Sequence, residues 1–173
     1  YRLHKEIIKD ISKSEEERLL AKVMQTPKFK LLKSNVKPNA YIGLGMHSWD
    51  KFKENDLQDG ERAARLLSNY AIPKEEPIVK NFVRALRDDK ILEEEFSYYK
   101  PEIARFKNRF LGLNNGGGLM VLIYTCQALL GYGDDMKVQP FVETSYKAFE
   151  SVLHMKALED ITIFKPELKR KNN

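Results

Sequence analysis

The sequence predicts an all-α fold, and three observations support this prediction. Apolar residues recur at helical spacing, three or four residues apart, in most segments of the chain. The most continuously apolar run, residues 119–130, lies between Gly118 and Gly131. No segment alternates apolar and polar residues with the period of two that marks a half-buried strand. We therefore expect a helical bundle that leads into armadillo-like helical repeats.

The apolar run at residues 119–130 determines the expected architecture. A helix that is apolar on every side must have neighbours on several sides, so we expect this one to be buried all round within a layered stack. The run is about a dozen residues long, whereas a bilayer span needs roughly 20. Cys126, the single cysteine of the chain, lies within it. We expect a buried, inert thiol in a protein of a reducing compartment.

Cap and turn signals divide the rest of the chain into short helices. Ser14 followed by Glu17 is a capping-box pattern, and Thr26 followed by Pro27 marks another helix start. Asp88 and Asp89 are interpreted as a helix end. Together with the apolar spacing, these signals predict helices over residues 3–11, 14–24, 27–34, 60–70, 78–86, 91–99, 101–111, 119–130 and 140–153.

The weakest helical signal lies in residues 35–60, which contain Pro38, Gly43 and Gly45. We expect a long loop there, with one helical turn that begins at Ser48. His47 and Trp49 within it have two interpretations. They either anchor a partner or attach their own loop to the core, and the sequence leaves both open.

Composition limits the classes of function. The chain has 173 residues, which is enough for one sizeable core. Its 30 basic and 25 acidic residues give a net charge of +5, and they are scattered rather than gathered into a nucleic-acid footprint. A first residue of Tyr1 rather than Met indicates a piece of a longer protein. We expect a soluble intracellular chain with no membrane span.

Catalytic and metal-binding patterns are weak. The letters YGDD at residues 132–135 resemble the metal-binding turn of viral RNA polymerases, but that turn needs a strand on each side, so we expect a solvated turn after a helix end. The glycines at 116–118 lack the Lys-Ser or Lys-Thr of a phosphate-binding loop. The three histidines and the cysteine have no metal-ligand spacing. The sequence therefore predicts neither an enzyme nor a cofactor or metal site.

The order of several motifs resembles the N-terminal regulatory region of diaphanous-type formins. Residues 14–32, SEEERLLAKVMQTPKFKLL, are similar to that family's acidic helix followed by Met, Pro and a Lys-aromatic-Leu cluster, with Phe29 where tryptophan is usual. FVRALR at 82–87 is similar to a further family helix. The family's next pattern is an aromatic residue, a phenylalanine, a glycine turn and a leucine-rich helix, and it is matched by Phe106, Phe110, the glycine turn and LMVLI. The segment at 145–161, SYKAFESVLHMKALEDI, is similar to the family's KAF helix and the leucine-rich helix after it.

The resemblance implies a domain organisation and two partners. It implies a GTPase-binding-like segment at 1–72 with the loop at 35–60, armadillo-like helices at 73–165 and a frayed basic tail at 166–173. Such a region is non-catalytic and cytoplasmic, associates with the cytoskeleton, and affects actin only indirectly. It binds a GTP-loaded Rho-family GTPase and, in competition, the C-terminal autoregulatory segment of the same protein.

The resemblance also suggests contact residues. Lys28, Lys30 and Lys33 are the candidates for the acidic GTPase surface. Lys147, Ala148 and Ser151, on the side of the KAF helix away from Phe149 and Val152, are the candidates for a groove that takes the autoregulatory segment.

Two alternatives stay open at the level of sequence. One is a helical-repeat adaptor of another protein-interaction family, which shares only the generic packing. The other is a nucleic-acid-binding helical module that uses Arg105, Lys107, Arg109 and the basic residues at 169–171.

Overall fold

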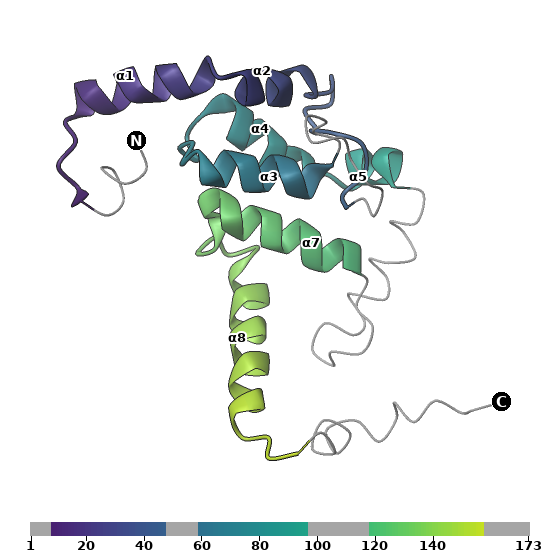
Figure 1. Cartoon of the computed structure of the whole chain (residues 1–173). Coiled ribbons are helices and arrows are strands. Elements are labelled where there is room, and N and C mark those ends of the chain that lie inside the picture. Colours follow the sequence, from purple (N-terminus) through teal and green to yellow (C-terminus); the bar gives the residue numbers. More distant parts are fainter. Residues whose placement is uncertain (1–7, 48–58, 97–117, 158–173) are drawn as a thin grey trace.

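The chain is helical, as the sequence predicts (Figure 1). A computed structural model describes residues 8–47, 59–96 and 118–157. The helices are α1 (Lys13–Met24), α2 (Pro27–Ser34), α3 (Gly60–Asn69), α4 (Pro77–Ala85), α5 (Asp89–Glu95), α7 (Gly118–Gln127), the π-helical η3 (Ala128–Tyr132) and α8 (Gln139–Leu153). Within these ranges, extended pairing is limited to one bridge between Val36 and Ile42. The all-α prediction is confirmed, and the armadillo-like repeat stays a prediction.

The helices lie in layers (Figure 1). α1 and α2 run along one side, α3 and α4 form the middle, and α7 lies beyond α3, against which it packs together with η3. α8 leaves this stack and points away from it. One hydrophobic cluster joins side chains from α2 through η3, so it runs across the predicted boundary at 72–73. None of the described helices is long and apolar enough to be a membrane span.

Two helix starts differ from the prediction and one agrees with it. Thr26 caps α2 by accepting a hydrogen bond from the Phe29 N–H at 3.3 Å, with Pro27 in the first turn, as expected. α1 is capped by Ser12 rather than Ser14, because Ser12 has the extended backbone of a cap while Ser14 lies inside the helix. Asp88 does not end α4; it caps α5 by accepting hydrogen bonds from two N–H groups of its first turn.

Residues 35–47, the described part of the loop before α3, contribute side chains to the core. Tyr41 is fully buried, and its ring lies edge-on to Phe82 of α4 and to Phe96 after α5, with 5.7 Å between centroids in both pairs. The Tyr41 hydroxyl donates to the Gly45 carbonyl oxygen at 2.8 Å, which satisfies a polar group that has lost water. Residues 35–47 are thus anchored from within, while Ser48 and Trp49 lie outside the described residues.

The expectation that the apolar helix is buried all round is wrong. One side of α7 is buried, at Leu119, Met120, Ile123, Cys126 and Gln127. Val121 is 42% exposed and Leu129, in η3, is 41% exposed. α3 packs against this segment, and an apolar composition alone does not supply neighbours on the remaining sides. Cys126 is free and buried, and burial raises the pKa of its thiol to about 12, so this thiol is protonated at neutral pH.

Arg87 joins α4, α7 and the approach to α8. Its Nε donates to Gln127 Oε1 at 2.6 Å, and its Nη1 donates to Asp135 Oδ2 at 3.3 Å. The guanidinium carbon lies 5.2 Å from the centre of the Tyr132 ring. These contacts come from residues 40 and 48 positions away from Arg87 in the sequence. They hold the connection between η3 and α8 against the end of α4.

The turn from η3 to α8 is the predicted helix end. Gly131 has a φ of 86°, a left-handed conformation that glycine adopts without strain. Val138 is fully buried just before α8 begins. Phe141, in the first turn of α8, stacks on Tyr124 of α7 with 5.3 Å between ring centroids. The base of α8 is therefore fixed by packing while the rest of the helix extends outward.

A matched pair of glycines tests the packing around Tyr41. Gly60 and Gly118 are the first residues of α3 and α7. A Cβ at Gly60 would lie 2.5 Å from Tyr41 Oη, whereas a Cβ at Gly118 would meet nothing within 4 Å. We expect Gly60→Ala to lower the free energy of unfolding by about 1–3 kcal/mol, because a buried hydroxyl with a fixed acceptor cannot move aside. Gly118→Ala is expected to change it by less than about 0.5 kcal/mol. Urea unfolding measures both, and equal effects would contradict this account.

Candidate functional site

The most exposed apolar surface of the described chain is a stripe along α8. Tyr146, Phe149 and Leu153 follow one another at spacings of three and four residues, so they lie on one face of the helix. Their exposed fractions are 68%, 75% and 82%. Val142, half-buried one turn earlier, continues the same face toward the stack. We call Tyr146, Phe149 and Leu153 the α8 stripe.

The exposure of the α8 stripe has a structural cause. α8 is attached through Val138 and Phe141 at its base, and it then leaves the stack (Figure 1). Single exposed apolar residues are normal on a protein surface, but successive ones on one helix face are typical of a binding surface. A bare amphipathic helix of this kind can place its apolar face against another helix or in a groove.

The predicted groove residues lie on the other side of α8. Lys147 is exposed and Ala148 is half-buried. The side chain of Ser151 lies outside the described residues. Phe149 and Val152, which the sequence places on the opposite side, are 75% and 56% exposed rather than packed against the core. The groove itself stays a prediction, and the α8 stripe is the surface that the structure adds.

The predicted GTPase contacts are on α2. Lys28, Lys30 and Lys33 are all exposed, while Phe29 and Leu32 of the same helix are buried. α2 and α8 lie at opposite ends of the view in Figure 1. The structure therefore does not bring the two predicted binding sites together, and competition between their ligands would require coupling through the stack rather than a shared surface.

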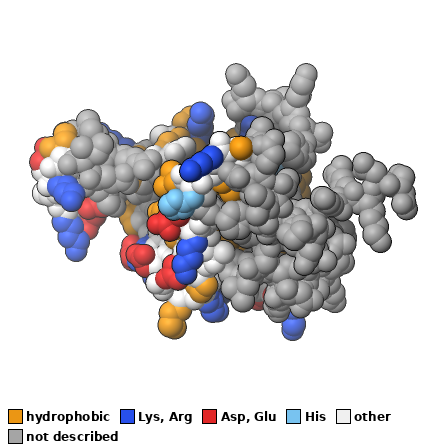
Figure 2. All heavy atoms as spheres, turned by 90° about the horizontal axis from the view of Figure 1, so that it is seen from below, with side chains coloured by type: hydrophobic (Ala, Val, Ile, Leu, Met, Phe, Trp, Pro, Cys, Tyr) orange, Lys and Arg blue, Asp and Glu red, His pale blue; other side chains and the backbone are white. Residues whose placement is uncertain are grey.

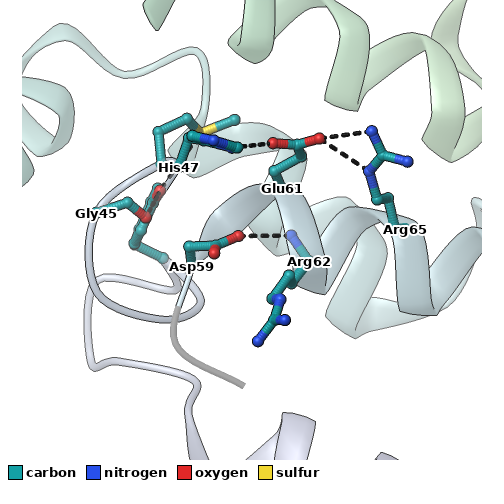
Figure 3. Close-up of polar contacts among 8 residues, drawn as sticks. Gly45, His47, Asp59, Glu61, Arg62 and Arg65 are labelled. Carbon is teal, nitrogen blue, oxygen red and sulfur yellow. Dashed lines mark hydrogen bonds and ion pairs between the residues drawn. The ribbon is translucent and has the colours of Figure 1, made fainter. Parts of the chain in front are cut away.

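A polar network ties the end of the loop to α3 (Figure 3). The Glu61 carboxylate lies between His47 and Arg65, with His47 Nδ1 at 2.5 Å from one oxygen and Arg65 Nε donating to the other at 2.8 Å. Partial burial by itself would raise the pKa of Glu61, but the hydrogen bonds from His47 and Arg65 outweigh it, and this pKa lies below its ordinary value. The network explains His47 as an attachment of its own loop.

Asp59 completes this junction. It is buried, and its Oδ1 accepts a hydrogen bond from the Arg62 N–H at 2.7 Å, which caps α3. Asp59, Glu61 and His47 are therefore all engaged in holding the start of α3.

The acidic turn of the YGDD segment is also structural. Asp135 Oδ1 accepts the Lys137 N–H at 2.9 Å, and this hydrogen bond and the charge of Arg87 lower the pKa of Asp135 despite some desolvation. Asp134 beside it is exposed. Across residues 8–47, 59–96 and 118–157, no three His, Cys, Asp or Glu side chains gather in a way that could hold a metal ion.

Figure 2 shows how charge is distributed on one face. Basic, acidic and apolar side chains are interspersed among the described residues there, without a continuous basic surface. Arg105, Lys107, Arg109 and the basic residues at 169–171 lie outside the described residues. On this face, the alternation of charge lacks the footprint expected for binding along a phosphate backbone.

Some of these contacts carry a signal in the sequence and others do not. Glu61 and Arg65 are four residues apart on a predicted helix, a spacing that favours an ion pair. The spacing of the α8 stripe is visible in the sequence, but the same spacing is produced by packing against a core. The contacts of Arg87 leave no local pattern, because its partners are distant in the chain.

Comparison of the chain with protein-family models, with curated proteins and with solved structures gives no match.

The Glu61 network predicts a pH-dependent contribution to stability. The pKa of Glu61 is lower in the folded chain than its ordinary value of 4.5, so its contribution is present above about pH 4.5 and is lost as the pH falls through the folded-state value. We expect Glu61→Gln to lower the free energy of unfolding by about 0.5–1 kcal/mol at pH 7. The difference should be smaller at about pH 3, because this contribution is lost progressively as the pH falls below 4.5.

Urea unfolding at the two pH values checks this expectation. Glu94→Gln is the matched control, because Glu94 is an exposed helical carboxylate that forms no hydrogen bond or ion pair with any of the described side chains. An effect of Glu61→Gln that is as large in acid as at neutral pH would show that the network does not stabilise the chain through its charge.

Proposed function

We propose that this chain is a non-catalytic regulatory domain of the formin type. It binds an active Rho-family GTPase and the C-terminal autoregulatory segment of the same protein, and it thereby controls actin nucleation and elongation in the cytoplasm. The order of motifs from residue 14 to residue 161 supports the family. The observation that carries a binding role is the α8 stripe, an apolar helix face that stands outside the stack.

The α8 stripe suits a helical partner segment. Its first and last side chains are seven positions apart, which is about 10 Å along the helix. An amphipathic helix offers apolar anchors at this same spacing, so two such faces can pack together. The autoregulatory segment is the occupant that we propose for α8. Ala148, on the other side of the helix, is the alternative contact within the same proposal.

α2 supports the GTPase half of the proposal. Its three exposed lysines present positive charge, and the buried Phe29 and Leu32 fix the helix to the core. Exposed cations of this kind increase the rate of association with an acidic surface, and this increase becomes smaller as the salt concentration rises. The two partners then contact different helices, and they influence one another only through the folded stack between them.

Capture of a Rho-family GTPase tests the α2 surface. We expect the chain to retain the GTP-locked form at least tenfold better than the GDP form, since the switch surface differs between the two states. Lys30→Glu with Lys33→Glu should weaken capture about tenfold or more, because both substitutions place like charges opposite an acidic surface. The control is Lys13→Glu with Lys22→Glu, which reverses two exposed lysines on α1. Equal capture of both nucleotide states would count against a formin.

Substitutions on α8 test the binding of the autoregulatory segment. Phe149→Ala with Leu153→Ala removes two side chains that are mostly exposed, so we expect unchanged thermal unfolding and at least tenfold weaker binding of a peptide with the autoregulatory sequence. Met136→Ala, which removes a side chain that is 89% exposed outside α8, is the matched control. Fluorescence anisotropy of a labelled peptide measures the affinity.

Ala148→Glu distinguishes the two faces of α8. If it abolishes binding while the double alanine variant binds normally, the partner uses the side of Lys147 and Ala148 instead of the α8 stripe. If neither variant changes the affinity while both remain folded, α8 does not bind the segment.

A further inference from the structure

A basic pocket lies beside α4, where the connection between η3 and α8 meets it. It has a volume of about 510 Å³ and is lined by residues of α4, of the end of α4, of η3 and of the connection to α8. Four of its lining residues are cations: Lys80, Arg84, Arg87 and Lys137. Pockets that hold small molecules commonly have volumes of about 300–1,000 Å³. This one is large enough for a ligand rather than only for water.

Carboxylates match the positive charge of the pocket only in part, because Asp135 pairs with Arg87 alone. Lys80, Arg84 and Lys137 are exposed, and none of them forms an ion pair within the described parts of the chain. Asp88 is the one acid among the lining residues. Its Oδ1 accepts hydrogen bonds from Lys90 N at 3.0 Å and Ile91 N at 3.2 Å, at the positive end of α5. The pocket therefore keeps a surplus of positive charge.

Arg87 belongs to the wall of the pocket. Gln127 and Asp135 accept hydrogen bonds from its Nε and Nη1, and its Nη2 is buried without a hydrogen-bond partner among the described residues. A ligand in the pocket therefore meets the exposed cations Lys80, Arg84 and Lys137 rather than this buried atom. Ammonium and guanidinium groups form strong, charge-assisted hydrogen bonds with phosphate and carboxylate oxygens.

The arrangement of the cations indicates how many anionic groups the ligand carries. Lys80, Arg84 and Arg87 occupy positions i, i+4 and i+7, so they follow one face of α4 and its end over about 10 Å. Lys137 approaches from the connection to α8. A single phosphate or carboxylate is too small to reach the whole array. A chain of two or three phosphates spans several of these positions and carries comparable negative charge in a compact volume.

The apolar part of the lining comes from Val83, which is buried, and from Tyr132. Tyr132 is its aromatic residue, and one face of that ring is covered by Arg87 while its hydroxyl donates to the Lys74 carbonyl oxygen at 3.3 Å. Recognition therefore falls on charge and on acceptor oxygens. We propose that this pocket binds the phosphate chain of a small oligophosphate, either free or as part of a nucleotide. The site is independent of α2 and of the α8 stripe.

Isothermal titration of the full chain at about 0.1 M salt tests the site, with inorganic tripolyphosphate as the probe. We expect submillimolar binding by the wild type and at least tenfold weaker binding by the variant Lys80→Gln, Arg84→Gln, Lys137→Gln. Arg87 is left unchanged, because it also holds the fold together. The matched control is Lys28→Gln, Lys30→Gln, Lys33→Gln, which removes the same charge from α2 and should bind as the wild type does.

Two further ligands separate the site from general attraction to anions. ATP should bind about as tightly as tripolyphosphate, which would identify the phosphate chain as the recognised part, and citrate should bind at least tenfold more weakly. Equal binding of citrate, equal weakening by both triple variants, or no binding of tripolyphosphate by the wild type would overturn the proposal. If the α2 variant loses capture of the GTPase but keeps tripolyphosphate, the two proposals stand separately.

Discussion

The hydroxyl of Tyr41 is buried among helices and must find an acceptor there, since an unpaired polar group in the core would cost about 1–3 kcal/mol. The Gly45 carbonyl oxygen supplies the acceptor, and this forces residues 41–45 to turn back within the core. The ring then determines where Phe82 and Phe96 can pack. The same hydroxyl leaves no space for a side chain at Gly60, so the start of α3 is fixed by it as well. The positions of α3, α4 and α5 therefore depend on one residue in a loop.

The basic pocket and the α8 stripe both lie next to the junction between the end of α4 and the segment that leads into α8. Arg87 is held by Gln127, Asp135 and Tyr132, so the end of α4 is joined to the segment that leads into α8. The neighbouring cations of α4, Lys80 and Arg84, form no ion pair within the described parts of the chain. α8 departs from the stack after its first turn, where Phe141 stacks on Tyr124 of α7. A basic pocket and a bare apolar helix thus lie on two sides of a single junction.

Local chemistry explains which parts of this structure the sequence could predict. Thr26 and Pro27 predict the start of α2, and the apolar spacing predicts α4, because these signals act within one helical turn. The cap of α1 was misplaced since Ser12 and Ser14 are equally good caps, and only the backbone decides between them. The burial of α7 on one side only, the position of Tyr41 and the contacts of Arg87 depend on residues far apart in the chain. The spacing of apolar residues does not indicate such contacts. It also does not distinguish a helix face that packs against the core from one that is exposed to solvent.

The 15-residue α8 is attached at its base and extends about 22 Å from it. Gly131, with its left-handed backbone, marks a kink in η3 ahead of the turn that leads to α8. A rotation of about 10° at that base would move the far end of the helix by about 4 Å, which is a large fraction of the distance between packed helices. Small changes in packing near Gly131, Tyr132 or Phe141 are therefore magnified at Leu153. The position of the far end of α8 therefore depends on packing at the base of the helix, and it does not depend on the chemistry of the side chains along it.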